Sequence, residues 1–393
     1  MLSIRYNKTI SILVAAFFLI ILITDFHFKV VLYHGLDSVK YTKLTKLIIG
    51  GVLAYLILKE VRLKQNIIIA LLILLSSFIL STIFCDYERI VHHIYVFGQY
   101  FFGLLVLTFF SQTRHLIDMK YFKLIVEYVI WINLLLIIVG YLFDIRVFDT
   151  YRGTRYGYNG IFKSTATASY FYIFYLSYLL LKRHKSKREI LLIIITTISS
   201  FFIGSKTVYI FVSLIFFLYI INQILRHKNP KQKSKYIYIY AALIAFILPF
   251  IILVIISMNS VLNDVYVREG FVTAFFSYRD VLFFNALDEV NHSFGFLNYL
   301  FGGVSYISKL TELALIDLLL TFGAIGTLVY IYIFYQLIPR VTKKLAQVIF
   351  LCILGVILFR GNFLYFSSVM YISLAIFTLM IEEINNKSNK ALS

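Results

Sequence analysis

The chain has 393 residues, of which 61% are hydrophobic and only 14% are charged. Its mean hydropathy of +0.88 lies outside the range of soluble globular proteins, so the composition indicates a polytopic membrane protein. A net charge of +18 would suggest a nucleic-acid partner for a soluble protein. Here the basic residues gather in short segments between apolar runs, which is typical of membrane orientation signals, and no nucleic-acid partner is expected.

Twelve apolar runs can cross a bilayer, for which about 20 residues are needed, or fewer where the membrane is thin. They cover residues 10–26, 44–59, 66–84, 93–110, 124–143, 164–181, 190–204, 207–225, 236–257, 312–335, 345–359 and 362–381. The first run lacks the cleavage site of a signal peptide and is interpreted as a retained span. The prediction is an all-α fold of about twelve transmembrane helices, with about ten or eleven as the alternatives.

The segments between these runs separate by charge. Alternate segments, from the N-terminus to the C-terminal tail and including KRHKSKR and RHKNPKQKSK, hold 23 of the 37 Lys and Arg. The positive-inside rule assigns them, with both termini, to the cytoplasm. The longest hydrophilic segment, 258–311, then lies outside, and its amphipathic core SYRDVLFFNALDEV is predicted to lie flat on the outer membrane surface. The chain is therefore predicted to be one integral-membrane domain, 1–393, with a large extracytoplasmic loop at 258–311.

Seven arginines lie on the predicted outer side, where the positive-inside rule predicts few basic residues. They are Arg89, Arg146, Arg152, Arg155, Arg268, Arg279 and Arg360. Guanidinium groups offer a planar fork of donors that suits phosphate, and an outward cluster of them could hold a pyrophosphate headgroup. In YRGTRYGYNGIFK, Tyr151 to Lys163, glycines would let the backbone approach such a ligand closely. The alternative is that the arginines snorkel to lipid phosphates and the tyrosines form an interfacial belt.

Two further motifs lie at predicted outer ends of spans. GSKT, 204–207, is not a P-loop because the upstream glycine and strand are missing, but Lys206 there either faces an anion or snorkels at a helix end. Glu312 and Asp317 enter the tenth run from outside, about 140° apart if both are helical. They could pair with the outer arginines or act as a general base, or Glu312 could simply favour a helix N-terminus.

Two lesser candidates complete the set. His292, in DEVNHSFG, could serve as a base or be a solvated loop histidine. Arg360, in the outer turn FRGN, could reach the same anion or anchor the interface. The cysteines Cys85 and Cys352 have no spacing that suggests a metal site or redox pair, and no metal or cofactor is expected.

The order of these motifs resembles bacterial O-antigen and capsule polymerases of the Wzy type and the related O-antigen ligases. The resemblance rests on RGTRYGYNGIFKSTATAS, GSKT, the loop opening SYRD, and then FGG, ELALID and GAIG. It implies a GT-C-like, metal-independent glycosyltransferase of the bacterial cytoplasmic (inner) membrane with its active site on the outer face. Such an enzyme moves an oligosaccharide from undecaprenyl pyrophosphate to a sugar hydroxyl on another carrier-linked unit. It would work with membrane lipids, a chain-length regulator and a flippase.

The resemblance also suggests residue roles. Arg155, Arg279, Glu312 and Asp317 are the catalytic candidates, and Arg152, Lys163, Lys206, Arg268, His292 and Arg360 are the substrate-binding candidates. Fixed cations beside the departing pyrophosphate would lower the barrier as charge develops on it. Two departures stand out: SYISKLTELA lacks the histidine that many members have near the end of the loop, and Lys206 replaces the more usual arginine.

Three other functions explain the sequence less well. A ligase that uses a lipid A core acceptor is disfavoured by the missing histidine and the modest loop. A flippase for lipid-linked oligosaccharide would need charged residues along a path through the bilayer, yet mid-span positions are almost uniformly apolar. No internal repeat is evident, which also weakens a transporter built from duplicated halves. A purely structural scaffold leaves the outer arginines unexplained.

Overall fold

The computed structural model of the chain describes residues 2–35, 40–61, 63–85, 87–151, 156–182, 185–226, 260–338, 344–361 and 363–389. Within these ranges the regular structure is helical and no strand is present; a single antiparallel bridge joins Asp149 and Tyr158. The predicted all-α fold is thus confirmed for the described part of the chain.

Eleven of the twelve predicted runs correspond to helices, and the run 236–257 lies outside the described residues. The helices are α1 (Leu2–Tyr33), α2 (Lys40–Glu60), α3 (Gln65–Ile83), α4 (Ile90–Gln112), α5 (Met119–Phe143), α6 (Thr165–Leu181), α7 (Lys187–Phe202), α8 (Lys206–Arg226), α14 (Ala314–Leu337), α15 (Lys344–Arg360) and α16 (Ser367–Asn389). By length and composition, eight helices in the described part of the chain can cross a membrane, while α6 and α15 are apolar but shorter.

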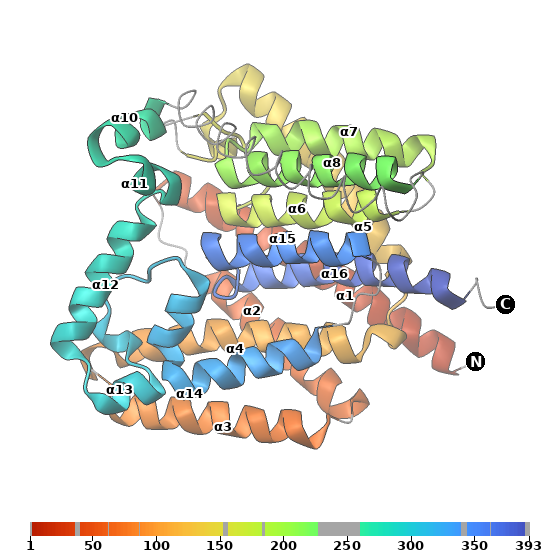
Figure 1. The fold of residues 1–393 in the computed structure, drawn as a ribbon. Coiled ribbons are helices and arrows are strands. Elements are labelled where there is room, and N and C mark those ends of the chain that lie inside the picture. Colours follow the sequence, from red (N-terminus) through yellow and green to blue (C-terminus); the bar gives the residue numbers. More distant parts are fainter. Residues whose placement is uncertain are drawn as a thin grey trace.

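The long helices lie side by side in a bundle with α6, α15 and α16 in its middle (Figure 1). α6 is buried on all sides from Ala166 to Leu180, as expected of an apolar helix without a polar face. It packs against α16, which is also largely buried. Peripheral helices such as α3 turn many large apolar side chains outward, and these suit contact with lipid.

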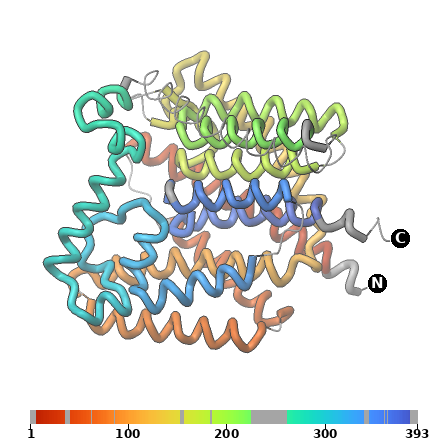
Figure 2. Tube along the Cα trace, in the orientation of Figure 1, coloured from red at the N-terminus to blue at the C-terminus, as the bar shows by residue number. Residues whose placement is uncertain are grey.

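α1 begins and α16 ends on the same side of the bundle, and the short helices between α8 and α14 lie on the opposite side (Figures 1 and 2). These short helices are α10 (Ser260–Glu269), α11 (Phe271–Phe276), α12 (Arg279–Ser293) and α13 (Phe296–Phe301). α12 contains most of the predicted amphipathic segment and runs across the ends of the long helices. We call this side of the bundle the loop end and the other side the terminal end.

A sharp corner separates α11 from α12. Ser277 and Tyr278 both have positive φ angles, of 53° and 66°, which non-glycine residues adopt only at some energetic cost. The corner makes Arg279 the first residue of α12 and turns its side chain toward the bundle.

α14 is broken at Gly323, whose φ of 62° and ψ of −170° are not helical. A Cβ there would lie 2.3 Å from the carbonyl carbon of Leu300, so the close approach of α13 requires glycine. The backbone NH of Gly303 donates to the Leu320 carbonyl over 2.9 Å. This bond satisfies a carbonyl of α14 that lies near the break. The motifs FGG and GAIG therefore form the contact between α13 and α14, and the break at GAIG interrupts the run predicted as one span over 312–335.

Candidate functional site

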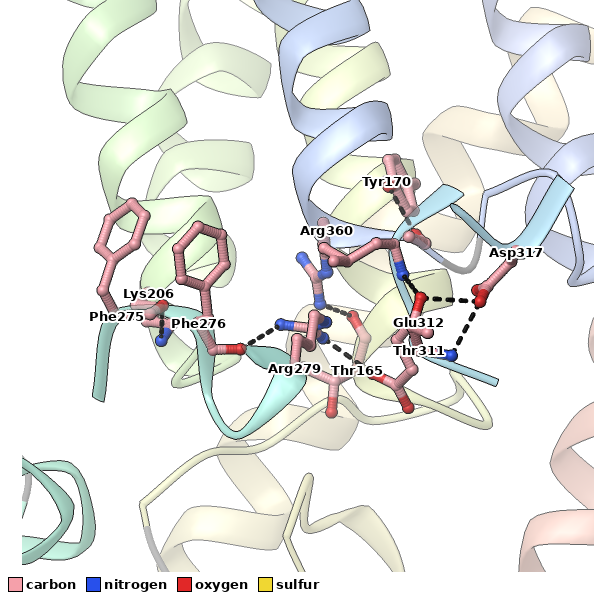
Figure 3. A network of polar contacts seen from close by, with 12 residues as sticks. Thr165, Tyr170, Lys206, Phe275, Phe276, Arg279, Thr311, Glu312, Asp317 and Arg360 are labelled. Atoms are coloured by element: carbon pink, nitrogen blue, oxygen red, sulfur yellow. Dashed lines mark hydrogen bonds and ion pairs between the residues drawn. The ribbon is translucent and has the colours of Figure 1, made fainter. Parts of the chain in front are cut away.

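Two arginines and a glutamate meet at the loop end (Figure 3). The Nη2 atom of Arg279 donates to Oε2 of Glu312 over 2.9 Å, and its Nη1 atom donates to the Phe276 carbonyl over 3.1 Å. Arg360, at the end of α15, is only 7% exposed and donates from Nη2 to the Thr165 carbonyl over 3.2 Å. Arg360 interacts electrostatically with both Arg279 and Glu312. We call Arg279, Arg360 and Glu312 the arginine cluster.

Two hydrogen-bond donors of the arginine cluster have no acceptor in the described part of the chain. The Nε atom of Arg279 and the Nη1 atom of Arg360 are both buried without a hydrogen-bond partner. A buried donor without a partner costs free energy, and among the described residues the two guanidinium charges interact with one carboxylate, that of Glu312. An anionic ligand with several oxygen acceptors would satisfy both the free donors and the excess positive charge.

Backbone packing fixes the position of Glu312. Its φ angle is 59°, in the left-handed region, and its carbonyl oxygen would lie 1.8 Å from a Cβ placed on Gly361. Gly361 itself has a φ of 67°, and its own carbonyl accepts from the buried hydroxyl of Tyr170 over 3.0 Å. Only glycine fits at 361, and Tyr170 ties this turn to the centre of the bundle.

Asp317 acts on the same turn from inside α14. Its Oδ1 atom accepts from the backbone NH and the hydroxyl of Thr311, over 2.7 and 2.8 Å. Neither bond involves an arginine, so this buried carboxylate holds the turn that carries Glu312. Because α14 begins at Ala314, Glu312 is not helical, and the predicted 140° separation of the two acids on one helix is wrong.

Lys206, the first residue of α8, donates from Nζ to the carbonyls of Ala274 (2.7 Å) and Phe275 at the end of α11. An ammonium group at the carboxyl end of a helix is favoured by the helix dipole and satisfies carbonyls that have no helical partner. Lys206 thus anchors α11 immediately before the corner that presents Arg279.

The glycine-rich segment sits on the turn between α7 and α8. A Cβ on Gly157 would lie 2.6 Å from the Ile203 carbonyl oxygen, and one on Gly204 would lie 2.2 Å from that of Tyr156. Both glycines, and Gly160 against Asn133, allow close contact within the chain rather than with a ligand. Arg152 and Arg155 lie outside the described residues.

The other predicted site residues are not brought to the arginine cluster. Lys163 lies over the Phe28 ring, with Nζ 3.9 Å from the ring centroid. Arg268 is exposed on α10. His292 is 80% exposed beside Asp288 and lies about 20 Å along α12 from Arg279, at 1.5 Å per residue.

An apolar cavity of about 370 Å³ lies between α12, α13 and the first half of α14. Its lining includes Phe283, Leu287, Val290, Tyr299 and Leu319, and it begins one helical turn beyond Arg279. The cavity was not predicted from the sequence, although the amphipathic pattern of α12 indicated an apolar face. Tyr170 was also missed, because it lies in the aromatic run YFYIFYLSY and no spacing distinguishes it.

The chain matches no protein-family model, no curated protein and no solved structure.

Proposed function

We propose that this protein is a polysaccharide polymerase of the bacterial cytoplasmic membrane, with about twelve spans and its loop end on the extracytoplasmic side. It transfers an oligosaccharide from undecaprenyl pyrophosphate to a sugar hydroxyl on a second carrier-linked unit. The main support is the arginine cluster, in which two guanidinium groups at the loop end retain buried donors without partners. The order of the sequence motifs adds to this support.

In the proposed reaction, the bond between the anomeric carbon and the diphosphate oxygen breaks as the acceptor hydroxyl oxygen bonds to that carbon. Negative charge builds on the departing diphosphate, and Arg279 and Arg360 stabilise it in a site largely shielded from water. Glu312, whose side chain is 43% exposed, takes the hydroxyl proton. Arg279 exchanges part of its contact with Glu312 for the diphosphate and so frees a carboxylate oxygen to accept that proton.

The apolar cavity beside α12 suits the isoprenoid chain of the carrier. It is lined by aliphatic and aromatic side chains that begin one helical turn beyond Arg279, so a diphosphate at the arginine cluster would place the first isoprene units against Phe283 and Leu287. Lys206 and Asp317 are positioning residues in this scheme, because they hold α11 and the 311–313 turn.

Deletion and complementation of the gene in its host test the proposal. A polymerase mutant makes surface glycan with single repeat units, and the wild-type gene restores long chains. Long chains that stay on the lipid carrier in the mutant would indicate a ligase. Carrier-linked units that stay on the cytoplasmic face would indicate a flippase. Either of these two results contradicts the proposal.

A further inference from the structure

A second group of cations lies at the loop end, around the last turns of α1. Asp25, Phe28 and Lys29 are three and four residues apart and so share one face of that helix. From α2, Lys46 places Nζ 3.2 Å from Oδ1 of Asp25, and the Lys163 ammonium lies over the Phe28 ring.

Lys29 connects this face to the segment that follows α5. Its Nζ atom donates to Oδ1 of Asn159 over 2.5 Å and to the Gly160 carbonyl over 2.8 Å. Lys43, exposed on α2, lies with Nζ 4.4 Å from the Tyr95 ring centroid and interacts electrostatically with Lys163. We call Lys29, Lys43, Lys46 and Lys163 the lysine cluster.

Among the described residues, the acids around the lysine cluster do not balance it. Asp25 interacts with Lys46 and Lys163, and Asp149 interacts with Lys29, so in this part of the chain four ammonium groups face two carboxylates. Burial lowers the pKa of the Lys163 ammonium, Asp25 raises it, and the Lys46 and Lys43 charges lower it again. A further anion in this place would offset the excess positive charge.

The outer side of α2 shows what kind of anion fits. Leu44, Leu47 and Ile48 alternate with Lys43 and Lys46, and all three are more than half exposed. Apolar side chains directed outward from a membrane bundle contact lipid chains, and neighbouring lysines reach lipid phosphates at the interface. A free phosphate would use the lysines but leave the apolar side chains without a role.

We propose that the lysine cluster is a second phosphate site, separate from the arginine cluster, which holds the phosphate headgroup of a membrane lipid whose chains lie along α2. Lys163 is two residues before Thr165, whose carbonyl holds Arg360. A bound lipid therefore fixes the short segment that joins the two clusters. This last link alone rests on the proposed function, while lipid binding does not.

Native mass spectrometry of the purified full-length protein with added phosphatidylglycerol tests the site. We expect the wild type to retain the lipid and the K43A/K163A variant to bind it about 30-fold more weakly, since each lysine near a lipid phosphate contributes roughly fivefold. K43A alone changes an exposed residue, is expected to fold normally, and should show about a fivefold loss. Lys59, half-exposed at the other end of α2, is the matched control, and K59A should bind like the wild type.

Three outcomes would overturn the proposal. Unchanged lipid retention in K43A and K43A/K163A would show that the lysines do not hold the headgroup. An equal loss in R279A would show that both clusters belong to a single site. Displacement of the lipid by an equal concentration of inorganic phosphate would assign the lysines to a soluble anion. Because none of these readouts requires glycan synthesis, they are independent of whether the protein is a polymerase.

Discussion

The two ends of the bundle differ in how completely their charged side chains are paired. At the terminal end, Nη2 of Arg188 lies 2.5 Å from Oε2 of Glu127, with Lys123 4.0 Å from the other oxygen, and Lys182 pairs with Glu189. At the loop end, the arginine cluster sets two guanidinium groups against one carboxylate and leaves two buried donors without partners.

This difference distinguishes charges that stabilise the fold from charges that are available to bind a ligand. The terminal ion pairs join α5 to α7 and fix the start of α7, where Ser186 and Glu189 also form a capping box. Their charges are satisfied within the chain. The unsatisfied donors of the arginine cluster raise the free energy of the folded protein when no ligand is bound. A bound anion would supply the hydrogen-bond acceptors that they lack.

The largest effect is expected for Arg279→Ala. It removes a cation from the leaving group and should reduce polymerisation by about 10²- to 10³-fold, the usual cost of one charge-stabilising group. Surface glycan from a complemented deletion strain, separated by gel electrophoresis, should show single repeats, while immunoblots of membranes show normal protein. Long chains in this variant would contradict the assignment of Arg279 to the active site.

Gly361→Ala should lower the stability of the protein. Its Cβ would meet the Glu312 carbonyl at 1.8 Å in a backbone conformation that alanine avoids, so we expect a loss of roughly 2 kcal/mol. Thermal unfolding in detergent measures this loss. The control is Gly355→Ala in α15, the helix that ends just before Gly361, where a Cβ meets nothing within 4 Å and a small gain is expected. Equal melting temperatures for the two variants would contradict the packing of the 312 turn.

Arg360→Lys tests whether the planar fork matters or only the charge. Lysine keeps the positive charge but cannot hold the Thr165 carbonyl and a diphosphate oxygen with the geometry of a guanidinium. We expect about a tenfold fall in chain extension, seen as a shift of the glycan ladder to short chains, with normal protein levels. An unaltered ladder would show that only the positive charge of Arg360 matters and not the geometry of its guanidinium group.

The smallest effect on activity is expected at the terminal end. Arg188→Ala breaks the pair with Glu127, and because Arg188 is largely exposed the cost in stability should be about 1 kcal/mol. The glycan ladder should keep its wild-type length for the protein that inserts. Loss of long chains at normal protein levels would mean that the two ends of the bundle are not separate in function.

Hydropathy alone predicted most of the fold, since apolar runs such as 66–84 and 124–143 became α3 and α5 with bounds shifted by a few residues. The amphipathic period of 277–290 likewise predicted α12. The break at Gly323 was not predictable, because it depends on α13 approaching the backbone from a distant part of the chain. In the same way, the sequence suggested Lys206 as a phosphate ligand, but folding brings two carbonyls of α11 to its ammonium group.

Within the candidate site, residue type predicted Arg279 and Arg360, because the positive-inside rule makes arginines rare on the predicted outer side. It predicted Glu312 because an acid at the start of an apolar run is costly without a partner. It did not distinguish Glu312, which meets an arginine, from Asp317, which binds Thr311. That distinction follows from the left-handed turn at Glu312, which no local pattern indicates.

The most direct test of the unsatisfied arginine cluster is a comparison of carrier lipids that differ by one phosphate. Binding of undecaprenyl pyrophosphate and undecaprenyl phosphate to wild type and R279A can be measured on the purified proteins. The wild type should prefer the pyrophosphate by about tenfold, since the second phosphate adds acceptors for Arg279 and Arg360, and R279A should lose most of this preference. An unchanged preference in R279A would contradict the assignment of the arginine cluster as a diphosphate site.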